Sequence, residues 1–270
     1  MKGEIIIRGG GDLASGVALR LHRARLKLIV CEIEKPLSVR RTVSFSEAVY
    51  EKMTGVEDVI ACLAEDINEV KKILSKGQIP VLVDPDCRIL DQIEPAVIVD
   101  ARMKKQEIQD KLKTEAMIIG LGPGFTAGKN CDAVIETNRG HNLGRVIWEG
   151  CAEGDTGIPG PVNGITSERV IRAPASGMLQ PTVEIGSLVT KGELIAYVDD
   201  TEVFSLISGL VRGMAHSGLP VHEGMKIGDI DPREDINLCR FVSEKALAIG
   251  GGVLEAILSR PEMPRKLWGI

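Results

Sequence analysis

The sequence predicts an α/β protein with a Rossmann-like N-terminal domain, a smaller β domain and a C-terminal helix that packs back onto the first domain. A strand, a glycine turn and a helix open the chain, and a stretch dense in glycine and proline begins near residue 150. Beyond it, short segments punctuated by glycine continue to residue 231. The predicted boundaries are 1–150 for the Rossmann-like nucleotide-binding domain, 151–167 for a linker, 168–231 for the β domain and 236–260 for the C-terminal helix.

The first unit is an apolar run at residues 5–7, a glycine turn at 9–16 and a helix. Gly9 and Gly11 have the dinucleotide-binding spacing, in which the backbone turns sharply and approaches a pyrophosphate at a helix N-terminus. Glu32 ends the next apolar run at the distance where an acid can hold a ribose hydroxyl pair. The alternative is a structural turn that binds no ligand. The predicted binding residues of this unit are Gly9, Gly10, Gly11, Asp12, Leu13, Ala14 and Glu32.

The rest of the first domain alternates further strands with helices. A proline-marked turn predicts a loop and a short strand over 33–43, and helical patterns follow at 45–50 and 67–74. Continuous apolar runs are typical of a sheet that is buried on both faces. Such runs occupy residues 79–83, 96–99, 116–120, 132–136 and 145–148.

Two later segments add candidate binding residues. The glycine turn at 120–129 lacks the ending of a P-loop, yet its backbone N–H groups could form an anion-binding nest. The polar segment 136–145 could hold a carboxylate, phosphate or metal, and we expect it to face the first glycine turn beyond the carboxyl ends of the strands. The alternative is that its arginines pair with Glu136 and Glu149 at the surface. The added residues are Arg40, Arg41, Gly122, Pro123, Gly124, Phe125, Glu136, Arg139, His141 and Arg145.

Composition narrows the function classes. Lys and Arg number 33 against 38 Asp and Glu, so the net charge of −5 offers no basic footprint for nucleic acid. No apolar stretch approaches the roughly 20 residues that span a bilayer, so we expect no membrane partner and a cytoplasmic location. The six cysteines have no CxxC spacing and are expected to be reduced. The histidines lack metal-ligand spacing, so no metal site is predicted, and no catalytic residue follows from spacing.

The β domain contains an internal repeat, because the pattern of residues 173–195 returns in 207–229. Two similar halves predict a pseudo-symmetric small barrel. The pattern resembles the barrel-sandwich hybrid of biotinyl and lipoyl carrier domains. Those carriers present a modified lysine at a turn, whereas the corresponding turn at 198–203 has none. The resemblance therefore implies a structural or docking module rather than a swinging-arm carrier.

The last segment, 237–259, predicts a helix that contains Gly250, Gly251 and Gly252. Each glycine inside a helix costs about 1 kcal/mol relative to alanine. We expect these glycines to allow close approach to another backbone or to a ligand, in a segment that folds back onto the first domain. A break between two short helices is the alternative.

Several strings of the sequence, taken together, point to one family. They are residues 9–16, 34–36, 39–45, 122–125, 136–146, 156–160 and 248–252. In combination they resemble the YqeB-type accessory proteins of selenium-dependent molybdenum hydroxylases, over nearly the whole chain. That family is associated with the maturation of hydroxylases that carry a labile selenium at a molybdenum cofactor, beside the XdhC-type chaperones. The resemblance implies a role in cofactor maturation and supplies no reaction or catalytic residue.

The leading hypothesis is an accessory protein that binds a nucleotide or a nucleotide-bearing molybdenum cofactor. The expected ligand is an NAD-like dinucleotide or a molybdopterin nucleotide. The expected partners are a molybdenum hydroxylase or other cofactor-maturation proteins, and homo-oligomerisation stays open. The main rival is an NAD(H)-dependent oxidoreductase that uses Glu32 for ribose and the polar segment for substrate. The second rival is a structural scaffold with an empty glycine turn.

Overall fold

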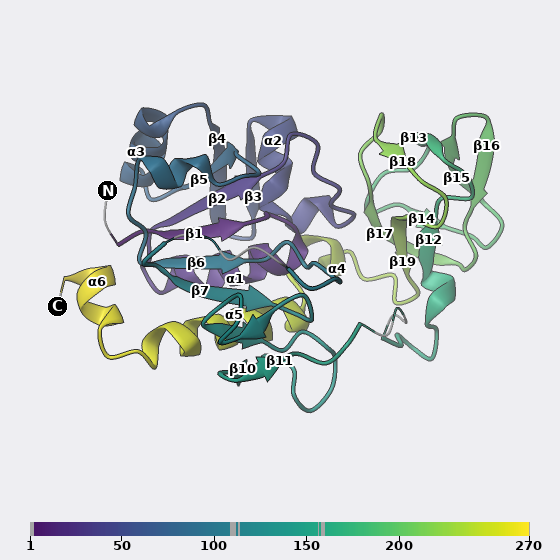
Figure 1. Cartoon of the computed structure of the whole chain (residues 1–270). Coiled ribbons are helices and arrows are strands. Elements are labelled where there is room, and N and C mark those ends of the chain that lie inside the picture. The colour runs from purple at the N-terminus through teal and green to yellow at the C-terminus, as the bar shows by residue number, and fades with distance from the viewer. Residues whose placement is uncertain (1–2, 109–111, 113, 156, 158–159, 270) are drawn as a thin grey trace.

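The computed structural model describes residues 3–108, 112, 114–155, 157 and 160–269. Two parts are apparent in Figure 1, which we call the α/β body and the β sandwich. The α/β body comprises the described residues of 3–151 and 237–269, and the β sandwich comprises residues 167–231. The sandwich is therefore inserted into the sequence of the body. None of the helices in the described residues is long and apolar enough to cross a membrane.

A nine-stranded sheet forms the centre of the α/β body, with the strand order β10-β9-β7-β6-β1-β2-β5-β4-β3. Seven of its strands run parallel, and an antiparallel strand closes each edge. The carboxyl ends of the parallel strands therefore lie along one edge of the sheet. The strands are β1 (Ile5–Arg8), β2 (Leu28–Glu32), β3 (Met53–Val56), β4 (Val59–Ala64), β5 (Ile79–Val83), β6 (Val97–Asp100), β7 (Met117–Leu121), β9 (Ala133–Ile135) and β10 (Val146–Ile147).

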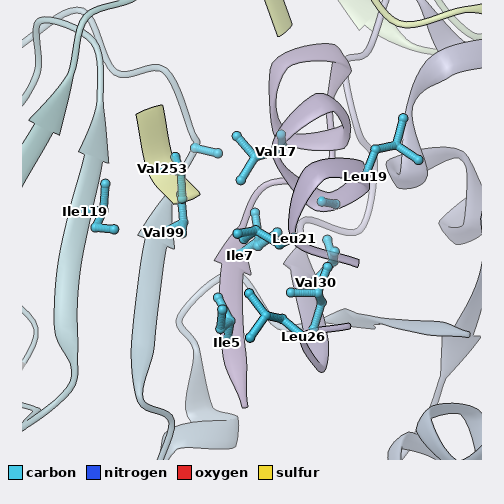
Figure 2. Packing of buried hydrophobic residues seen from close by; sticks show 14 of the residues in the cluster. Ile5, Ile7, Val17, Leu19, Leu21, Leu26, Val30, Val99, Ile119 and Val253 are labelled. Carbon is cyan, nitrogen blue, oxygen red and sulfur yellow. The ribbon is translucent and has the colours of Figure 1, made fainter. Parts of the chain in front are cut away.

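Two long helices cover one face of this sheet. Helix α1 (Asp12–Arg23) follows the glycine turn, and α5 (Glu244–Leu258) returns from the far end of the chain to lie against it. Figure 2 shows Val17 and Leu21 of α1 and Val253 of α5 packed over the apolar side chains of the central strands. Burial of this continuous apolar surface is the main stabilisation of the body.

Glycine allows helix α5 to approach the backbone of α1 and the backbone of Gly144 closely. A Cβ on Gly250 would lie 2.8 Å from the carbonyl oxygen of Gly16, and one on Gly252 would overlap the carbonyl oxygen of Gly144. No atom lies within 4 Å of the corresponding position on Gly251. The expected close approach of backbones is therefore present at two of the three glycines. The helix breaks instead at residues 241–243, between α4 (Asn237–Arg240) and α5.

The other face and the edges carry shorter elements. Asp66 caps the N-terminus of helix α3 (Ile67–Ser75), because its carboxylate accepts hydrogen bonds from two first-turn N–H groups. The helix packs with Val70 and Ile73 in a buried apolar cluster separate from that under α1 and α5. The predicted short strand within 33–43 is wrong, because this segment contains bends and a 3₁₀ helix. The remaining elements of the body are η1 (Arg41–Val43), η2 (Phe45–Glu47), α2 (Ala48–Glu51), η3 (Arg88–Asp91), β8 (Thr126–Ala127), β11 (Gly150–Cys151) and α6 (Met263–Trp268).

The β sandwich consists of two four-stranded antiparallel sheets that enclose their own apolar core. Their strand orders are β12-β19-β17-β14 and β16-β15-β13-β18. Strands β17 and β19 lie on the side of the sandwich that faces the body in Figure 1. The elements are η4 (Ser167–Arg169), β12 (Val170–Arg172), β13 (Gly177–Pro181), β14 (Leu188–Val189), β15 (Leu194–Val198), β16 (Thr201–Phe204), β17 (Gly209–Met214), β18 (Pro220–Val221) and β19 (Lys226–Asp231).

The predicted fold class, a Rossmann-like domain with a biotinyl- or lipoyl-like domain, is wrong. A Rossmann-like sheet needs helical crossovers between parallel strands. This sheet is mixed, and the described residues between β6 and β7 contain no helix. The antiparallel sheets do not stand apart as a carrier-like module, because Val39 of the body packs directly on Gly213. The chain is a mixed α/β protein with one large, mainly parallel sheet and smaller antiparallel sheets.

Candidate functional site

Glu32 holds the first glycine turn in place. Its two carboxylate oxygens accept hydrogen bonds from the N–H groups of Gly10 and Ile33, each at 2.7 Å. Burial raises the pKa of the Glu32 carboxyl, and the two backbone hydrogen bonds partly offset that rise. A ribose-binding acid presents free oxygens to its ligand, whereas these oxygens already serve the protein's own backbone. The predicted ribose role of Glu32 therefore loses its geometric support.

The segment after η1 covers one side of the same turn. The N–H of Ser46 donates to the carbonyl oxygen of Gly10 at 2.8 Å, and a Cβ on Gly10 would lie 2.8 Å from that nitrogen. The hydroxyl of Ser15 fixes the contact, since it accepts from the N–H of Phe45 at 2.8 Å. Gly10 is thus required for packing. Gly11 is less enclosed, because its nearest neighbour in that direction is the hydroxyl of Ser38 at 3.4 Å.

Helix α1 begins at Asp12 without a side-chain cap, so the helix itself leaves the N–H groups of its first turn unsatisfied. Among these first-turn residues, Leu13 is half-buried and Ala14 is buried in the apolar core. The N-terminus of such a helix favours negative charge. Asp12 supplies one negative charge, and Nη1 of Arg40 donates to both oxygens of its carboxylate at 2.9 and 3.0 Å.

Arg40 and Arg41 connect parts of the chain rather than stand free for a phosphate. Nη2 of Arg40 donates to the carbonyl oxygens of Leu238 and Phe241, and its Nε has no hydrogen-bond partner among the described residues. Arg41 donates from Nε to the carbonyl oxygen of Met214 at 2.8 Å, which joins the body to the sandwich. Both arginines therefore have structural partners.

The second glycine turn is a packing turn. Gly120 lies directly against the ring of Phe125, which is itself buried, and Gly124 packs on the carbonyl oxygen of Lys104. The N–H of Gly122 already donates to the carbonyl oxygen of Ile135, and Pro123 has no N–H to offer. The donors of this turn are thus largely committed, and the geometry gives no support to an anion-binding nest.

The polar segment 136–145 has one buried member and several exposed ones. Glu136 is buried and accepts from the N–H groups of Asn138 and Glu153, so it shapes the loop. Arg139 pairs with Glu244 at the start of α5, and not with Glu136 as the surface alternative expected. Nη2 of Arg145 lies 3.4 Å from Nε2 of His141, and both side chains are exposed.

A set of charged side chains lies where the N-termini of α1 and α5 meet strands β17 and β19. Burial lowers the pKa of Arg212, of Lys226 and of Lys245, and the carboxylate of Asp12 opposes the decrease in all three cases. Asp12 is therefore close enough to act on cations from both parts of the protein. We call this set the junction cluster. Its members, linked by ion pairs or by these electrostatic effects, are Asp12, Arg40, Arg169, Arg212, Lys226, Asp229, Asp231, Arg233 and Lys245.

The six cations of the junction cluster differ in how closely carboxylates pair with them, and the carboxylates of Glu136, Asp155 and Glu244 also act on members of the cluster. Arg169 pairs with Asp229, although its Nε lacks a hydrogen-bond partner in the described structure. Arg212 lies 3.9 Å from the carboxylate of Asp229 and 3.8 Å from that of Asp231. Nζ of Lys226 is also 3.8 Å from its nearest carboxylate oxygen. Such long contacts leave these cations able to bind an added anion.

The structure brings together some of the predicted site residues. Asp12 and Arg40 belong to the junction cluster, and Arg139 and Glu136 both act on the pKa of Lys245, where burial is the larger cause of the decrease. The polar segment thus approaches the N-terminus of α1 through Lys245, whereas no such contact links His141 or Arg145 to it in the described residues. The sandwich cations were missed. The sequence feature that could have indicated them is Arg212, a charged residue within the otherwise apolar segment that forms β17, whose residues are all buried.

A second polar group also joins the two parts of the protein. Glu47, Glu51 and His216 each place a ligand-type atom within 4.8 Å of the others, although sequence spacing predicted no metal site. Arg41 lies in the same group, since its Nη1 donates to Glu47 at 2.9 Å and lies 3.3 Å from Nε2 of His216. The guanidinium supplies the positive charge that a metal ion would otherwise bring, so the group is explained as an ion-pair network.

The chain is similar to the uncharacterized protein YqeB of Escherichia coli (strain K12). The two are 50% identical over 254 residues, which cover 94% of this chain and 47% of YqeB. The match supports a relationship to YqeB, and the chain spans about half the length of this curated relative. The name says nothing of selenium or of molybdenum hydroxylases. A scan against protein-family models found no match.

Comparison with solved structures gives only partial likenesses. A succinylglutamate desuccinylase/aspartoacylase from Rhodobacter sphaeroides overlaps 24% of this chain and 22% of its own, with 25% identity and a TM-score of 0.22. The apo ectoine utilization protein EutE (DoeB) from Ruegeria pomeroyi overlaps 85% and 86%, with 12% identity and a TM-score of 0.24. An aspartoacylase family protein from Mesorhizobium loti overlaps 85% of each chain, with 9% identity and a TM-score of 0.25.

Proposed function

We propose that this chain is an accessory protein for the maturation of a molybdenum hydroxylase, acting in the cytoplasm, and that it binds a nucleotide-bearing form of the molybdenum cofactor. The motif strings that resemble the YqeB-type accessory proteins support the biological role. Two cations of the junction cluster, Arg212 and Lys226, have no close carboxylate partner among the described residues, and this supports the ligand class because a nucleotide-bearing cofactor is a phosphate-rich anion.

The observation that carries the proposal is the local charge of the junction cluster. The whole chain has a net charge of −5, so its total charge does not attract anions. At the junction, however, Arg212 and Lys226 have only long contacts with carboxylates, and the adjoining first turn of α1 has no side-chain cap. A phosphate there would satisfy helix N–H groups and unmatched cations together.

The oxidoreductase alternative has less support from the geometry. It requires Glu32 to hold a ribose, yet both oxygens of Glu32 accept backbone hydrogen bonds at the glycine turn. The cations of the junction cluster bind phosphate irrespective of the base or ribose that follows. We therefore favour recognition of the phosphate groups over the NAD-type ribose contact.

Calorimetric titration of the full chain tests the ligand class. The panel contains pyrophosphate, cytidine diphosphate, adenosine diphosphate and NAD⁺ at one fixed ionic strength. We expect diphosphates to bind. The Lys226→Ala and Lys245→Ala variants should each bind about 10- to 150-fold more weakly, since one charge-assisted hydrogen bond contributes about 1.5–3 kcal/mol. Lys71→Ala on the exposed face of α3 is the matched control and should leave affinity unchanged.

Absence of binding by every phosphate compound would contradict the ligand class and favour the scaffold alternative. Equal losses of affinity in Lys226→Ala and Lys71→Ala would show that the phosphate compounds bind through general surface charge and not at the junction cluster. Selective binding of NAD⁺ that depends on Glu32, with affinity unchanged in the junction-cluster variants, would favour the oxidoreductase hypothesis.

A cellular assay tests the maturation role separately. Cells that lack the gene and contain a selenium-dependent molybdenum hydroxylase are complemented with the wild type, with Lys226→Ala/Lys245→Ala or with Lys71→Ala. We expect hydroxylase activity to fall with the double variant and to be restored by the other two, at equal levels of hydroxylase protein. Full hydroxylase activity without any copy of the gene would contradict the maturation role.

A further inference from the structure

Two cysteines that are distant in sequence meet beneath a surface loop of the α/β body. Cys31 lies near the carboxyl end of β2, and Cys87 lies in the loop after β5. Strands β2 and β5 are hydrogen-bonded neighbours, so the loop folds over the end of β2. The two side chains belong to one buried apolar cluster, where Cys31 is 3% exposed and Cys87 is 2% exposed.

The loop positions Cys87 through several hydrogen bonds. The N–H of Asp84 donates to the carbonyl oxygen of Glu32 at 2.9 Å, and the N–H of Cys87 donates to that of Asp84 at 3.1 Å. The carboxylate of Asp84 accepts from the N–H groups of Arg88 and Ile89 at 2.8 and 2.9 Å. Cys87 itself has φ of +55°, a backbone conformation that costs a non-glycine residue energy. The surrounding contacts therefore maintain this position of the thiol.

The thiols of Cys31 and Cys87 are hydrogen-bonded to each other. This bond is the main cause that lowers the pKa of Cys87 and raises the pKa of Cys31. The guanidinium of Arg8 also lowers the pKa of Cys87, whereas burial and the carboxylates of Asp84 and Asp100 oppose that decrease. Arg8 is the register neighbour of Cys31 across β1 and β2, and its Nη2 donates to the carbonyl oxygen of Pro85 at 3.1 Å. The charge of Arg8 therefore acts on both thiols.

We propose that Cys31 and Cys87 form a reversible disulfide when the protein meets a hydroperoxide, and that Cys87 is the sulfur that reacts first. Cys87 is flanked in sequence by the exposed residues Asp86 and Arg88, so local movement of the loop admits a small oxidant. Cys31 is then the resolving thiol, already in contact. The inference is independent of the ligand proposed for the junction cluster.

The chemistry needs no component beyond the two thiols and the peroxide. The Cys87 thiolate attacks one peroxide oxygen, the O–O bond breaks, and a sulfenic acid forms while an alcohol or water leaves. The sulfur of Cys31 then attacks the sulfenic sulfur, the S–S bond forms and the S–O bond breaks. Water departs with the hydroxyl of the sulfenic acid and the proton of the Cys31 thiol, and the proton that Cys87 lost in forming its thiolate completes the alcohol or water of the first step. The two sulfur atoms are oxidised by two electrons, and the peroxide is reduced by the same two.

Mass spectrometry of the full chain after limited treatment with hydrogen peroxide tests the proposal. Remaining thiols are blocked with N-ethylmaleimide before digestion without reductant. We expect a mass loss of about 2 Da for the disulfide form, a linked peptide pair that contains Cys31 and Cys87, and full reversal by dithiothreitol. Because this measurement uses the wild type, it does not depend on how well a variant folds.

Variants assign the two roles. Cys31→Ser should leave a sulfenic acid on Cys87 that dimedone traps, whereas Cys87→Ser should leave Cys31 unoxidised. Cys62→Ser is the matched control, since Cys62 is half-buried with a pKa that burial raises, and it should form the disulfide as the wild type does. The proposal is overturned if the exposed Cys151 is fully oxidised while Cys31 and Cys87 both remain free to react with N-ethylmaleimide after unfolding.

Discussion

The two clusters of buried arginine and aspartate differ in how their charges are matched. At the carboxyl edge of the main sheet, Asp100 accepts hydrogen bonds from Arg8 at 3.1 Å and from Arg102 at 2.6 and 2.8 Å. Every charged group of this edge cluster has a close partner. In the junction cluster, Arg212 has no carboxylate oxygen closer than 3.8 Å. The comparison separates a network of close hydrogen-bonded ion pairs from one in which Arg212 and Lys226 have only long contacts with carboxylates.

The difference has a physical consequence for each region. A buried ion pair with good geometry resists the loss of either partner, because the charge that remains is left without compensation. A cation without a close partner costs the free protein stability and is stabilised by an anionic ligand. We therefore expect substitutions at the edge cluster to damage stability and substitutions at the junction cluster to affect binding.

The largest effect is expected for Asp100→Ala. It leaves the buried Arg8 without its carboxylate, and breaking a buried pair in this way costs about 3–5 kcal/mol. Urea denaturation measures the change in the free energy of unfolding. Asp86→Ala is the matched control, because Asp86 pairs with Arg88 on the surface and should contribute about 0–1 kcal/mol. A small loss in Asp100→Ala would remove the distinction between the two clusters.

The close contact of α5 with the backbone of Gly144 should respond next. A Cβ in Gly252→Ala meets the carbonyl oxygen of Gly144, so we expect a loss of about 1–3 kcal/mol from overpacking. Gly251→Ala is the paired control, because its Cβ meets open space and alanine favours a helix by up to about 1 kcal/mol. Thermal unfolding of both variants measures the contrast, and equal behaviour would show that α5 is not held closely at Gly144.

Removal of an unmatched cation should cost little in the free protein. For Arg212→Met we expect a change of less than about 1.5 kcal/mol in either direction, since a methionine fills a similar volume and removes a poorly paired charge. The same variant should lose the stabilisation that pyrophosphate gives to the wild type. Thermal shift with and without pyrophosphate checks both statements, and a loss as large as that of Asp100→Ala would contradict the comparison.

The smallest effect is a dependence on alkaline pH. Burial lowers the pKa of Lys226 and of Lys245 from 10.5, so between the lowered pKa and 10.5 the unfolded chain binds more protons than the folded protein. Stability should therefore rise with pH across that window. Urea denaturation at about pH 8 and about pH 10 should show this rise in the wild type and a smaller rise in Lys226→Met/Lys245→Met. An identical pH dependence would exclude these lysines as its source.

Sequence patterns predicted the local elements of the body well, because a buried parallel strand requires a continuous apolar run. Ile79–Val83 is β5 as predicted, and β6 and β7 are shifted by one residue from the expected ranges. The glycines of α5 also predicted a close approach of backbones, because the energetic cost of glycine inside a helix has to be offset by a contact that a larger side chain would prevent. These features depend on forces that act on a few neighbouring residues.

The fold class and the candidate site depended on contacts that spacing does not encode. Gly9, Gly11 and Glu32 have the dinucleotide-binding spacing, yet Ser46 covers one side of the turn and Glu32 bonds to its backbone. The junction cluster combines Asp12 with Lys226, which are more than 200 positions apart in the chain. The electrostatic effect of such a pair exists only after both parts of the protein have packed together.

The insertion of the β sandwich sets the order in which a growing chain can complete its folds. The ribosome makes all nine strands of the main sheet before it makes the sandwich, and α5 emerges only after the sandwich is finished. Val253 and Ile257 of α5 belong to the core of the body, so that core stays open until late in synthesis. The sandwich can close on itself first, and the body then closes around its last long helix.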